Sequence, residues 1–540
     1  MKKTVILLML FFTMLSFGQI ALEHTYNNAI INRVNLEYSG EKYYEFKRAT
    51  NELMLYNADH TLWKTIVLPA PAPTNYTGTN LIHISEAVFN SDADLEIVFS
   101  YYNTTLPGYE TKIMSENGAV LATLDNVYNA SLSQIDGLSP KLIGISYNPN
   151  KSKVYAIPEL TLEHAYEEGI VSRIKLENSG EKYCLTDKVN GTENIYNSNH
   201  TIWKTISLPI PSGANYLDNI LLSEAIIPSD NLLEIGYNYY KVVDNVYYTL
   251  GGKIINENGA ELLFVPTATA FSLSVLDGCE TKLIATLRLP SSASCSNVYQ
   301  IPSLTLEHSY PSLMSRIKLE NSGEKYYTSE NPTTNFIKVY NPDHTLWKSI
   351  FLDIPFDFGS VGLRVDIISE NKIAADSLLE IGYCYVYYSP LMYEEFYGKI
   401  CNENGLTYLD TTGTQSYTLS VFPDLPNKLI ELINFPDVFE NTPNYKTSIY
   451  SIDATMGTSG FQKNSTIDVA PNPSNSVVNI ASTTQIVEAS IFNVLGAKVK
   501  DVKAQNLTKI NVENLPSGMY LLTLLDINNQ KSVHKITISH

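Results

Sequence analysis

One six-residue stretch carries the side chains best suited to chemistry, and it occurs three times. Its histidine follows an Asp or Asn, and an imidazole beside a carboxylate can act as a general base or bind a metal. An enzyme, however, needs one asymmetric site in which acid, base and binding groups converge. Asn199 also replaces the carboxylate in the second occurrence. The three stretches are Asp59-His60-Thr61-Leu62-Trp63-Lys64, Asn199-His200-Thr201-Ile202-Trp203-Lys204 and Asp343-His344-Thr345-Leu346-Trp347-Lys348.

We therefore predict a structural role for this stretch. The Asp or Asn caps backbone amides of a turn, and the His and Thr extend these hydrogen bonds. The three tryptophans of the chain all lie here, and a buried indole packs a large apolar area between neighbouring units. The residues with this predicted role are His60, Trp63, His200, Trp203, His344 and Trp347.

Tyrosines at the ends of predicted strands are the second candidate site. Tyr presents a flat apolar face and a polar tip, which suits a glycan or protein surface. Tyr is also a favoured strand residue in any sheet, so packing is the alternative role. The predicted ligand surface consists of Tyr101, Tyr102, Tyr239, Tyr240, Tyr387 and Tyr388.

The remaining polar patterns predict neither a catalytic or metal site nor a cofactor. Residues 90–94 have enough oxygens for Ca²⁺, but the corresponding turns of the other repeats have too few, so we interpret all of them as solvated turns. The sequence contains no Gly-rich phosphate loop, Gly-x-Ser-x-Gly elbow or His-Glu-x-x-His motif. Glu96, Glu234 and Glu380 recur in register within Leu-Glu-Ile, which indicates a structural position.

These stretches belong to a long internal repeat. Leu22, Leu162 and Leu306 each begin the same Leu-Glu-His and lie 140 and 144 residues apart. We define copy one as residues 19–160, copy two as 161–304 and copy three as 305–452. Each copy contains three units of about four short segments rich in β-branched and aromatic residues, typical of strands. Units of this kind match the blades of a β-propeller, and the three copies together give about nine.

The phase of the repeat predicts how the ends meet. Leu22-Glu23-His24 corresponds to the last strand of a unit, and the final unit, which ends at residues 449–452, lacks that strand. The N-terminal strand can fill this position and remove both open edges. Nine units exceed the four to eight typical of propellers, so three separate tandem β domains are the alternative fold. We favour the closed ring.

The N-terminus and the composition indicate export. Met1-Lys2-Lys3 and the apolar residues that follow predict a signal peptide over residues 1–18. An export route permits disulfides, and two pairs of cysteines each occur within a single copy. The candidate disulfides are Cys384 with Cys401, and Cys279 with Cys295. The net charge of −19 disfavours nucleic acid or anionic lipid as a partner.

After a linker of small residues (453–465), residues 466–540 contain about six short, regularly spaced strands, which predict a small Ig-like antiparallel sandwich. Three motifs in this segment resemble the type A C-terminal sorting domain of the type IX secretion system of Bacteroidetes. Ala497 separates Gly496 from Lys498, where Gly-Lys is common in that family. The motif residues are Pro471, Asn472, Pro473, Gly496, Lys498, Leu515, Gly518, Tyr520 and Lys535.

The resemblance implies Sec export, passage across the outer membrane and removal of the domain by the sortase of the system. The implied partners are the secretion machinery, its sortase and surface lipopolysaccharide, with attachment to the cell surface or release. We expect a secreted, non-enzymatic repeat protein that binds a glycan or a protein. The alternatives are an extracellular hydrolase with its site in the propeller channel, and a structural surface component.

Overall fold

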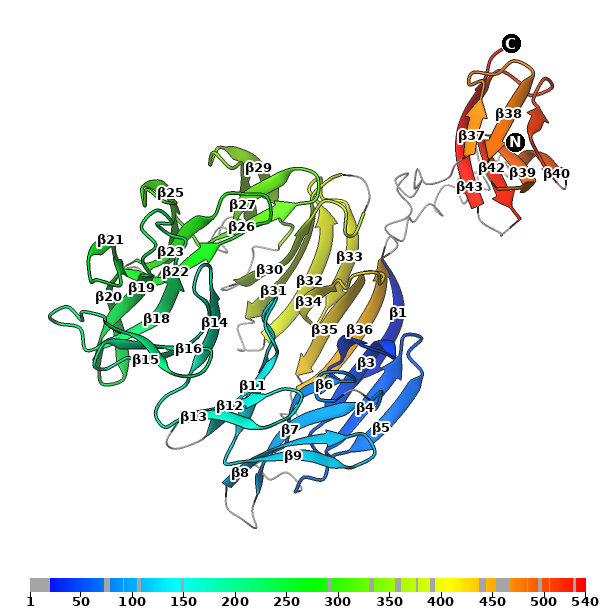
Figure 1. Cartoon of the computed structure of the whole chain (residues 1–540). Coiled ribbons are helices and arrows are strands. Elements are labelled where there is room, and N and C mark those ends of the chain that lie inside the picture. Colours follow the sequence, from blue (N-terminus) through cyan, green and yellow to red (C-terminus); the bar gives the residue numbers. More distant parts are fainter. Residues whose placement is uncertain are drawn as a thin grey trace. The chain divides into compact units, whose positions relative to one another are not determined.

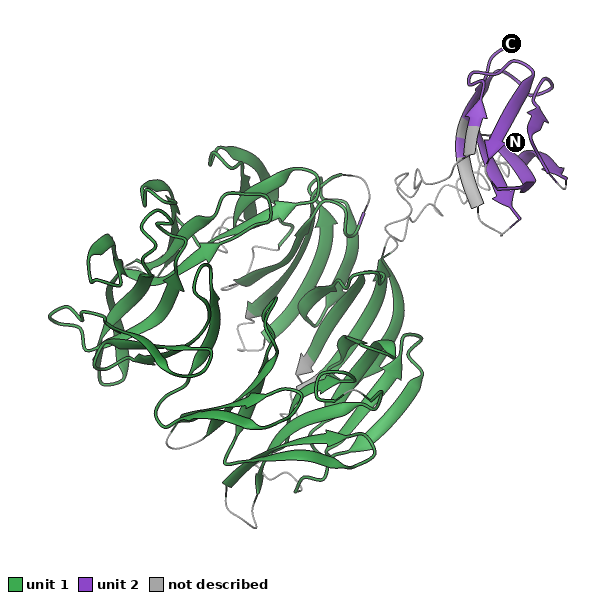
Figure 2. Ribbon diagram, viewed as in Figure 1, with its two compact units in different colours: residues 1–373, 377–452 green, residues 374–376, 453–540 purple. Residues whose placement is uncertain are grey.

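The computed structural model consists of strands, turns and loops in the residues that it describes. Within that part of the chain, no helix has the length and hydropathy needed to cross a membrane. The chain divides into two compact units (Figure 2): the ring unit, residues 1–373 with 377–452, and the sandwich unit, residues 453–540 with 374–376. The described residues are 20–71, 78–90, 92–103, 108–146, 150–289, 293–329, 335–354, 361–374, 377–388, 394–436, 443–452, 467–482, 484–493, 498–504, 506–527 and 531–540.

The described part of the ring unit contains nine four-stranded antiparallel sheets in succession (Figure 1). Copy one forms three sheets, the last of them completed by β13 from the start of copy two. They are β2 (Asn32–Leu36), β3 (Gly40–Lys47), β4 (Glu52–Asn57) and β5 (Leu62–Val67); β6 (Asn80–Ser85), β7 (Glu96–Asn103), β8 (Gly108–Ser115) and β9 (Val120–Asp125); and β10 (Asn129–Ser133), β11 (Lys141–Ser146), β12 (Lys151–Ala156) and β13 (Leu162–Tyr166).

Copy two forms the next three sheets, the last of them completed by β25 from the start of copy three. They are β14 (Ser172–Leu176), β15 (Gly180–Asp187), β16 (Thr192–Asn197) and β17 (Ile202–Ser207); β18 (Tyr216–Ser223), β19 (Glu234–Val243), β20 (Val246–Asn256) and β21 (Glu261–Pro266); and β22 (Ala268–Ser274), β23 (Lys282–Arg288), β24 (Ser294–Gln300) and β25 (Leu306–Tyr310).

Copy three forms the last three sheets, the final one with the help of the N-terminal strand β1 (Ile20–Asn27). They are β26 (Met314–Leu319), β27 (Gly323–Ser329), β28 (Phe336–Tyr340) and β29 (Leu346–Phe351); β30 (Val361–Ser369), β31 (Glu380–Tyr388), β32 (Glu394–Asn402) and β33 (Thr407–Thr412); and β34 (Thr414–Ser420), β35 (Lys428–Pro436), β36 (Pro443–Ile452) and β1.

Alternating side chains explain why these segments are strands and how the sheets stack. In β4, Leu53 and Leu55 are fully buried while Met54 between them is only half-buried, the period-two pattern of a strand. Leu53 and Leu55 pack with Ile97 and Phe99 of the next sheet in one apolar cluster. Comparable clusters join the other successive sheets, so each face of a sheet is covered by its neighbour. This stacking is the architecture of a β-propeller.

The ends of the ring unit meet as the repeat phase predicted. Strand β1, dark blue in Figure 1, runs antiparallel to β36, with Ile20 opposite Ile452 and Asn27 opposite Lys446. The first and last sheets also contact each other through Arg33 of β2. Its Nη1 donates to the Ser420 carbonyl at 3.0 Å and its Nη2 to the Pro426 carbonyl at 2.9 Å. The described ring is therefore closed, and the prediction that the N-terminal strand completes the last sheet is confirmed.

The closing junction repeats the contacts of the junctions inside the chain. Arg173 donates to the Ser133 and Ser139 carbonyls, and Arg316 to those of Ser274 and Glu280, as Arg33 does at the closure. One set of side chains thus fixes the angle between copies at all three junctions. A row of three independent β domains would not give the first and last sheets this contact.

The sandwich unit has two sheets. One contains β37 (Ile467–Ala470), β38 (Val477–Ser482) and β41 (Lys509–Asn511). The other contains β40 (Lys498–Lys503), β39 (Ile486–Asn493), β42 (Gly518–Asp526) and β43 (Lys531–Ile538). Both sheets contribute to a single core that includes Val478, Ile491 and Leu522. The predicted antiparallel sandwich is confirmed.

The candidate disulfides are wrong, since all five cysteines are free thiols. Cys384 packs against the sheet of β34–β36, whereas Cys401 packs against that of β26–β29, so the two side chains leave opposite faces of their own sheet. Cys279 precedes Lys282 at one end of β23, and Cys295 faces Leu287 near the other end. Five residues of strand, roughly 17 Å, separate these levels, which is too far for a disulfide. The predicted pairs were chosen because both cysteines lie in the same copy. That criterion does not tell which face of the sheet, or which end of the strand, each cysteine occupies.

Candidate functional site

Residues of three consecutive sheets of copy one line an open aromatic pocket of about 370 Å³. Its walls come from the turn after β3, from β6, β7 and β8, and from the start of β10. This volume lies within the roughly 300–1,000 Å³ typical of small-molecule sites. The lining residues are Arg48, Gly78, Thr79, Asn80, Ser100, Tyr101, Tyr109, Tyr128 and Asn129.

Tyrosine rings form the apolar part of this wall. Tyr109 in β8 meets Tyr102 edge to face at 5.1 Å and Tyr128, from the next sheet, at 5.8 Å. Such edge-to-face pairs hold aromatic rings at a fixed tilt. Tyr109 and Tyr128 are half-buried, so part of each ring faces the pocket.

Tyr101 is the buried member of the wall. Its hydroxyl donates to Oε2 of Glu110 at 2.6 Å, and Asn103 Nδ2 donates to Oε1 of the same carboxylate at 2.7 Å. Burial and the bond to Glu110 raise the pKa of Tyr101, so the phenol stays neutral at physiological pH. The hydrogen bond from Tyr101 in turn lowers the pKa of Glu110. The Tyr101 ring is thereby locked in place.

Hydroxyl, amide and guanidinium groups make up the polar part of the wall. Thr79 is 2% exposed, and its Oγ1 has no hydrogen-bond partner among the described residues. A buried hydroxyl without a partner costs free energy. Arg48 Nη2 donates to Oδ1 of Asn80 across a long 3.5 Å.

In copy two, the side chains at the position equivalent to the aromatic pocket bond to one another. Asp218 faces Asn238 as Asn80 faces Ser100, and Lys188 follows β15 as Arg48 follows β3. Here Lys188 Nζ bonds Asp218 Oδ1 at 2.6 Å. Thr269 stands at the position of Tyr128, and its carbonyl accepts a bond from Asn219 Nδ2 at 2.8 Å.

In copy three, the side chains at the position of the pocket also bond to one another. Arg364 faces Cys384 at the level of Asn80 and forms an ion pair with Asp366 at 2.6 Å. Its Nη2 donates to the carbonyl of Gln415, which stands where copy one has Tyr128. The three copies therefore share a scaffold but differ at this site.

The six tyrosines predicted to form a ligand surface have different environments. Tyr101 and Tyr102 belong to or adjoin the aromatic pocket. Tyr239 is buried, and Tyr240 meets the exposed Tyr247 edge to face at 5.9 Å. Tyr387 is half-buried opposite Glu395, whereas the side chain of Tyr388 lies outside the described residues.

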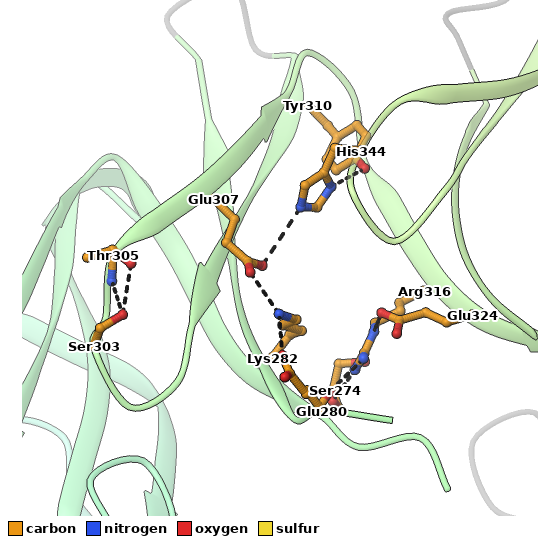
Figure 3. A network of polar contacts seen from close by, with 10 residues as sticks. All are labelled: Ser274, Glu280, Lys282, Ser303, Thr305, Glu307, Tyr310, Arg316, Glu324 and His344. Atoms are coloured by element: carbon orange, nitrogen blue, oxygen red, sulfur yellow. Dashed lines mark hydrogen bonds and ion pairs between the residues drawn. The ribbon is translucent and has the colours of Figure 1, made fainter. Parts of the chain in front are cut away.

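The repeated histidines lie at the junctions between copies. His344, in the turn before β29, has a φ of 64°, and its Nδ1 is 2.8 Å from the Tyr310 hydroxyl (Figure 3). Glu307 of β25 lies between this ring and Lys282, at 3.8 Å from His344 Nε2 and 2.7 Å from Lys282 Nζ. His60 and His200 make the corresponding contacts with Tyr26 and Glu23, and with Tyr166 and Glu163.

The side chain of each of these histidines is buried in a cluster of aromatic side chains. His60 stacks on His24 at 4.7 Å. Burial, and then the neighbouring His24, lower the pKa of His60, and the same causes act on His200 and His344. Asp59 accepts hydrogen bonds from the Thr61 amide at 3.0 Å and from the Thr61 hydroxyl at 2.5 Å. The arrangement favours neutral imidazoles in a packing role.

The repeated tryptophans sit between two lysines. Trp63 packs against the cluster that joins the first two sheets of copy one, and Lys42 and Lys64 lie over its ring at 4.8 and 4.1 Å. Lys64 continues to Glu116 of the next sheet at 2.5 Å. Trp203 and Trp347 have the same environment.

The glutamates Glu96, Glu234 and Glu380 are fully buried at the start of the second strand of each middle sheet. Burial raises the pKa of Glu96 and of Glu234 to about 7. They lie in three different sheets, at equivalent positions. Among the described residues, no group of three or more His, Cys, Asp and Glu side chains could hold a metal ion.

Sequence reasoning missed most of the aromatic pocket and the carboxylate partner of the histidines. Arg48, Thr79, Asn80 and Tyr128 come from three sheets, and none of them belongs to a repeated motif. The available signal was the difference between copies at one position, Asn80 against Asp218 and Arg364. For the histidines, the signal was Glu23 of Leu-Glu-His, which recurs in phase with His60.

The sorting-domain motifs lie together in the sandwich unit. Asn472 Oδ1 accepts from the Thr537 amide of β43 at 2.8 Å, so Pro471, Asn472 and Pro473 are joined to the last strand. Tyr520 is buried and donates to the Pro516 carbonyl, Leu515 packs on the core, and Gly518 and Lys498 begin β42 and β40. Gly496 and the side chain of Lys535 lie outside the described residues.

The fold and these motifs define an all-β exported protein with a propeller-like body and a sorting domain. Residues 468–539 match the family described as secretion system C-terminal sorting domain. This domain indicates type IX secretion, with a secreted or cell-surface location. No curated protein matches the sequence.

Solved structures similar to the chain include the Dos1 propeller, at 11% identity and a TM-score of 0.38, with 80% of this chain and 96% of that chain covered. Another is the extracellular domain of a putative hybrid two-component system from B. thetaiotaomicron, at 10% identity and a TM-score of 0.22, with 92% and 79% covered. A third is a protein of unknown function from Bacteroides caccae, at 9% identity and a TM-score of 0.21, with 42% and 77% covered.

Proposed function

We propose that this exported protein is a recognition module that binds a saccharide in the aromatic pocket of copy one. The observation that carries the proposal is the combination of the Tyr109 and Tyr128 rings with polar side chains, such as that of Asn80, in one wall. The C–H bonds on the face of a pyranose ring pack on aromatic rings, and its hydroxyls need donors and acceptors close by.

The chemistry of the wall favours binding over hydrolysis. Glycoside hydrolysis ordinarily uses two carboxylates that flank the scissile bond. The described residues that line the pocket include no Asp or Glu, and Glu110 is engaged with Tyr101 and Asn103. We therefore do not propose the extracellular hydrolase.

Export completes the proposal. The sorting domain brings the ring to the secretion machinery, and removal by the sortase leaves the ring either attached to surface lipopolysaccharide or released. In either case the pocket meets extracellular glycans.

A glycan array probed with the full chain tests this function, followed by titration of any glycan that binds. Tyr109→Ala and Tyr128→Ala should each weaken binding about ten-fold, since an aromatic contact contributes on the order of 1 kcal/mol or more. Tyr247→Ala, which removes a 56% exposed ring in copy two, is the matched control and should bind as the unchanged protein does. Absence of binding across the array would remove the proposal.

A further inference from the structure

The aromatic pocket is lined by one exposed cation that has no carboxylate partner among the described residues. Arg48 is the one charged residue among those lining the pocket, and no carboxylate pairs with it in the described residues. Its bond to Asn80 is long, at 3.5 Å, and goes to a neutral amide. Four of the five other arginines of the ring have a carboxylate oxygen within 2.8 Å, whereas the exposed Arg288 has none among the described residues; the four are Arg33, Arg173, Arg316 and Arg364.

Copy two shows what neutralisation at this place looks like. Lys188 occupies the position of Arg48, and Asp218 that of Asn80. The two form an ion pair at 2.6 Å, so this cation already has its anion. Asn80 in copy one is the neutral counterpart of that carboxylate, so Arg48 faces an amide where Lys188 faces a carboxylate.

We infer that the pocket takes a sugar that carries a carboxylate, and that Arg48 binds this carboxylate. The inference rests on the proposed saccharide function and specifies the class of ligand. A guanidinium presents paired N–H donors that match a carboxylate with two parallel hydrogen bonds. The pyranose ring then lies against Tyr109 and Tyr128.

The net charge of the chain further limits the class of ligand. A net charge of −19 repels polyanions at long range. One cation in the pocket matches one carboxylate, so a short glycan ending in a single hexuronic acid fits better than a chain of acidic residues.

The experiment uses pairs of short oligosaccharides that end in a hexuronic acid or in its carboxyl-reduced hexose. Each is titrated calorimetrically against the full chain. The acidic member should bind at least ten-fold more tightly than its reduced counterpart. Arg48→Gln should abolish this preference and leave binding of the reduced sugar unchanged.

Two further variants separate the role of Arg48 from general charge. Lys47→Gln removes the same charge one residue away and should keep the preference. Asn80→Asp places beside Arg48 the carboxylate that copy two has, and should abolish the preference as Arg48→Gln does. Circular dichroism of each variant verifies the fold.

The outcomes distinguish this inference from the proposed function. Equal binding of acidic and reduced sugars overturns the carboxylate inference and leaves saccharide binding standing. A preference that survives Arg48→Gln also overturns it. Binding of neither member of any pair overturns both.

Discussion

Lys428 in β35 and Glu23 in β1 form an ion pair of 2.5 Å across 405 positions of sequence. Lys141 pairs with Glu163 and Lys282 with Glu307 in the same way at the two junctions inside the chain. Both ends of the ring unit therefore meet through a contact that the repeat already uses twice. The ring therefore closes with the same Lys–Glu contact that joins neighbouring copies inside the chain.

Deletion of residues 20–27 should destabilise the sheet that closes the ring. The deletion removes the strand opposite β36, leaves an open edge and exposes Ile449 and Tyr450. Each lost backbone hydrogen bond costs about 1 kcal/mol. Hydrogen exchange should accelerate first in β35 and β36. Glu167→Gln, at the exposed ion pair with Lys151, is the control, and unchanged exchange in the deletion variant would contradict closure.

The sequence was sufficient to predict the sheets and their closure but not the pocket. Strand periodicity and the phase of Leu22-Glu23-His24 are local signals, and the ring follows from repeating them. The pocket arises where Arg48, Asn80 and Tyr128 of three sheets converge, and this depends on the angle between sheets. The predicted disulfides were wrong for a related reason. That Cys384 and Cys401 lie in the same copy of the repeat does not show which face of the sheet each one occupies.

Removal of residues 465–540 should block export across the outer membrane, because these residues contain the sorting domain. The ring unit should remain folded, because its core is separate from that of the sandwich unit. Cell fractionation with an antibody against the ring measures the outcome. An internal deletion of residues 456–460 in the linker is the control and should be exported. Normal export of the shortened chain would refute the sorting role.

All five cysteines should titrate as thiols once the protein is unfolded without reductant. In the folded protein, burial raises the pKa of Cys184, Cys295 and Cys384, and that of Cys401 to about 11. Little thiolate then exists at pH 8, and the thiolate is the reactive form. Cys279 is half-buried and should react first. A thiol count of three or fewer after unfolding would reveal the disulfides that the structure lacks.

Acidification should destabilise the ring through the junction histidines. The pKa of His60 in the folded state lies below the value of about 6.5 in the unfolded chain. Below pH 6.5 the unfolded state therefore binds more protons, so the free energy of unfolding falls as pH falls. His60→Gln should reduce this slope. Trp63, Trp203 and Trp347 all lie in the ring, so their fluorescence during urea unfolding at several pH values reports its stability. His540→Gln, in the sandwich unit, should leave the slope unchanged.

Glu96 should act in the opposite direction. Burial raises the pKa of Glu96 to about 7 in the folded state, whereas the unfolded value is about 4.3. Between these values the folded state binds more protons, so the contribution of Glu96 to stability is lost as pH rises through 7. Glu96→Gln keeps the shape without the charge. It should stabilise the ring at pH 8, by about 1–3 kcal/mol, and have little effect at pH 4.5. The same tryptophan-monitored unfolding measures both, and exposed Glu167→Gln is the control. A stabilisation by Glu96→Gln that did not change with pH would show that the carboxylate is not protonated on folding.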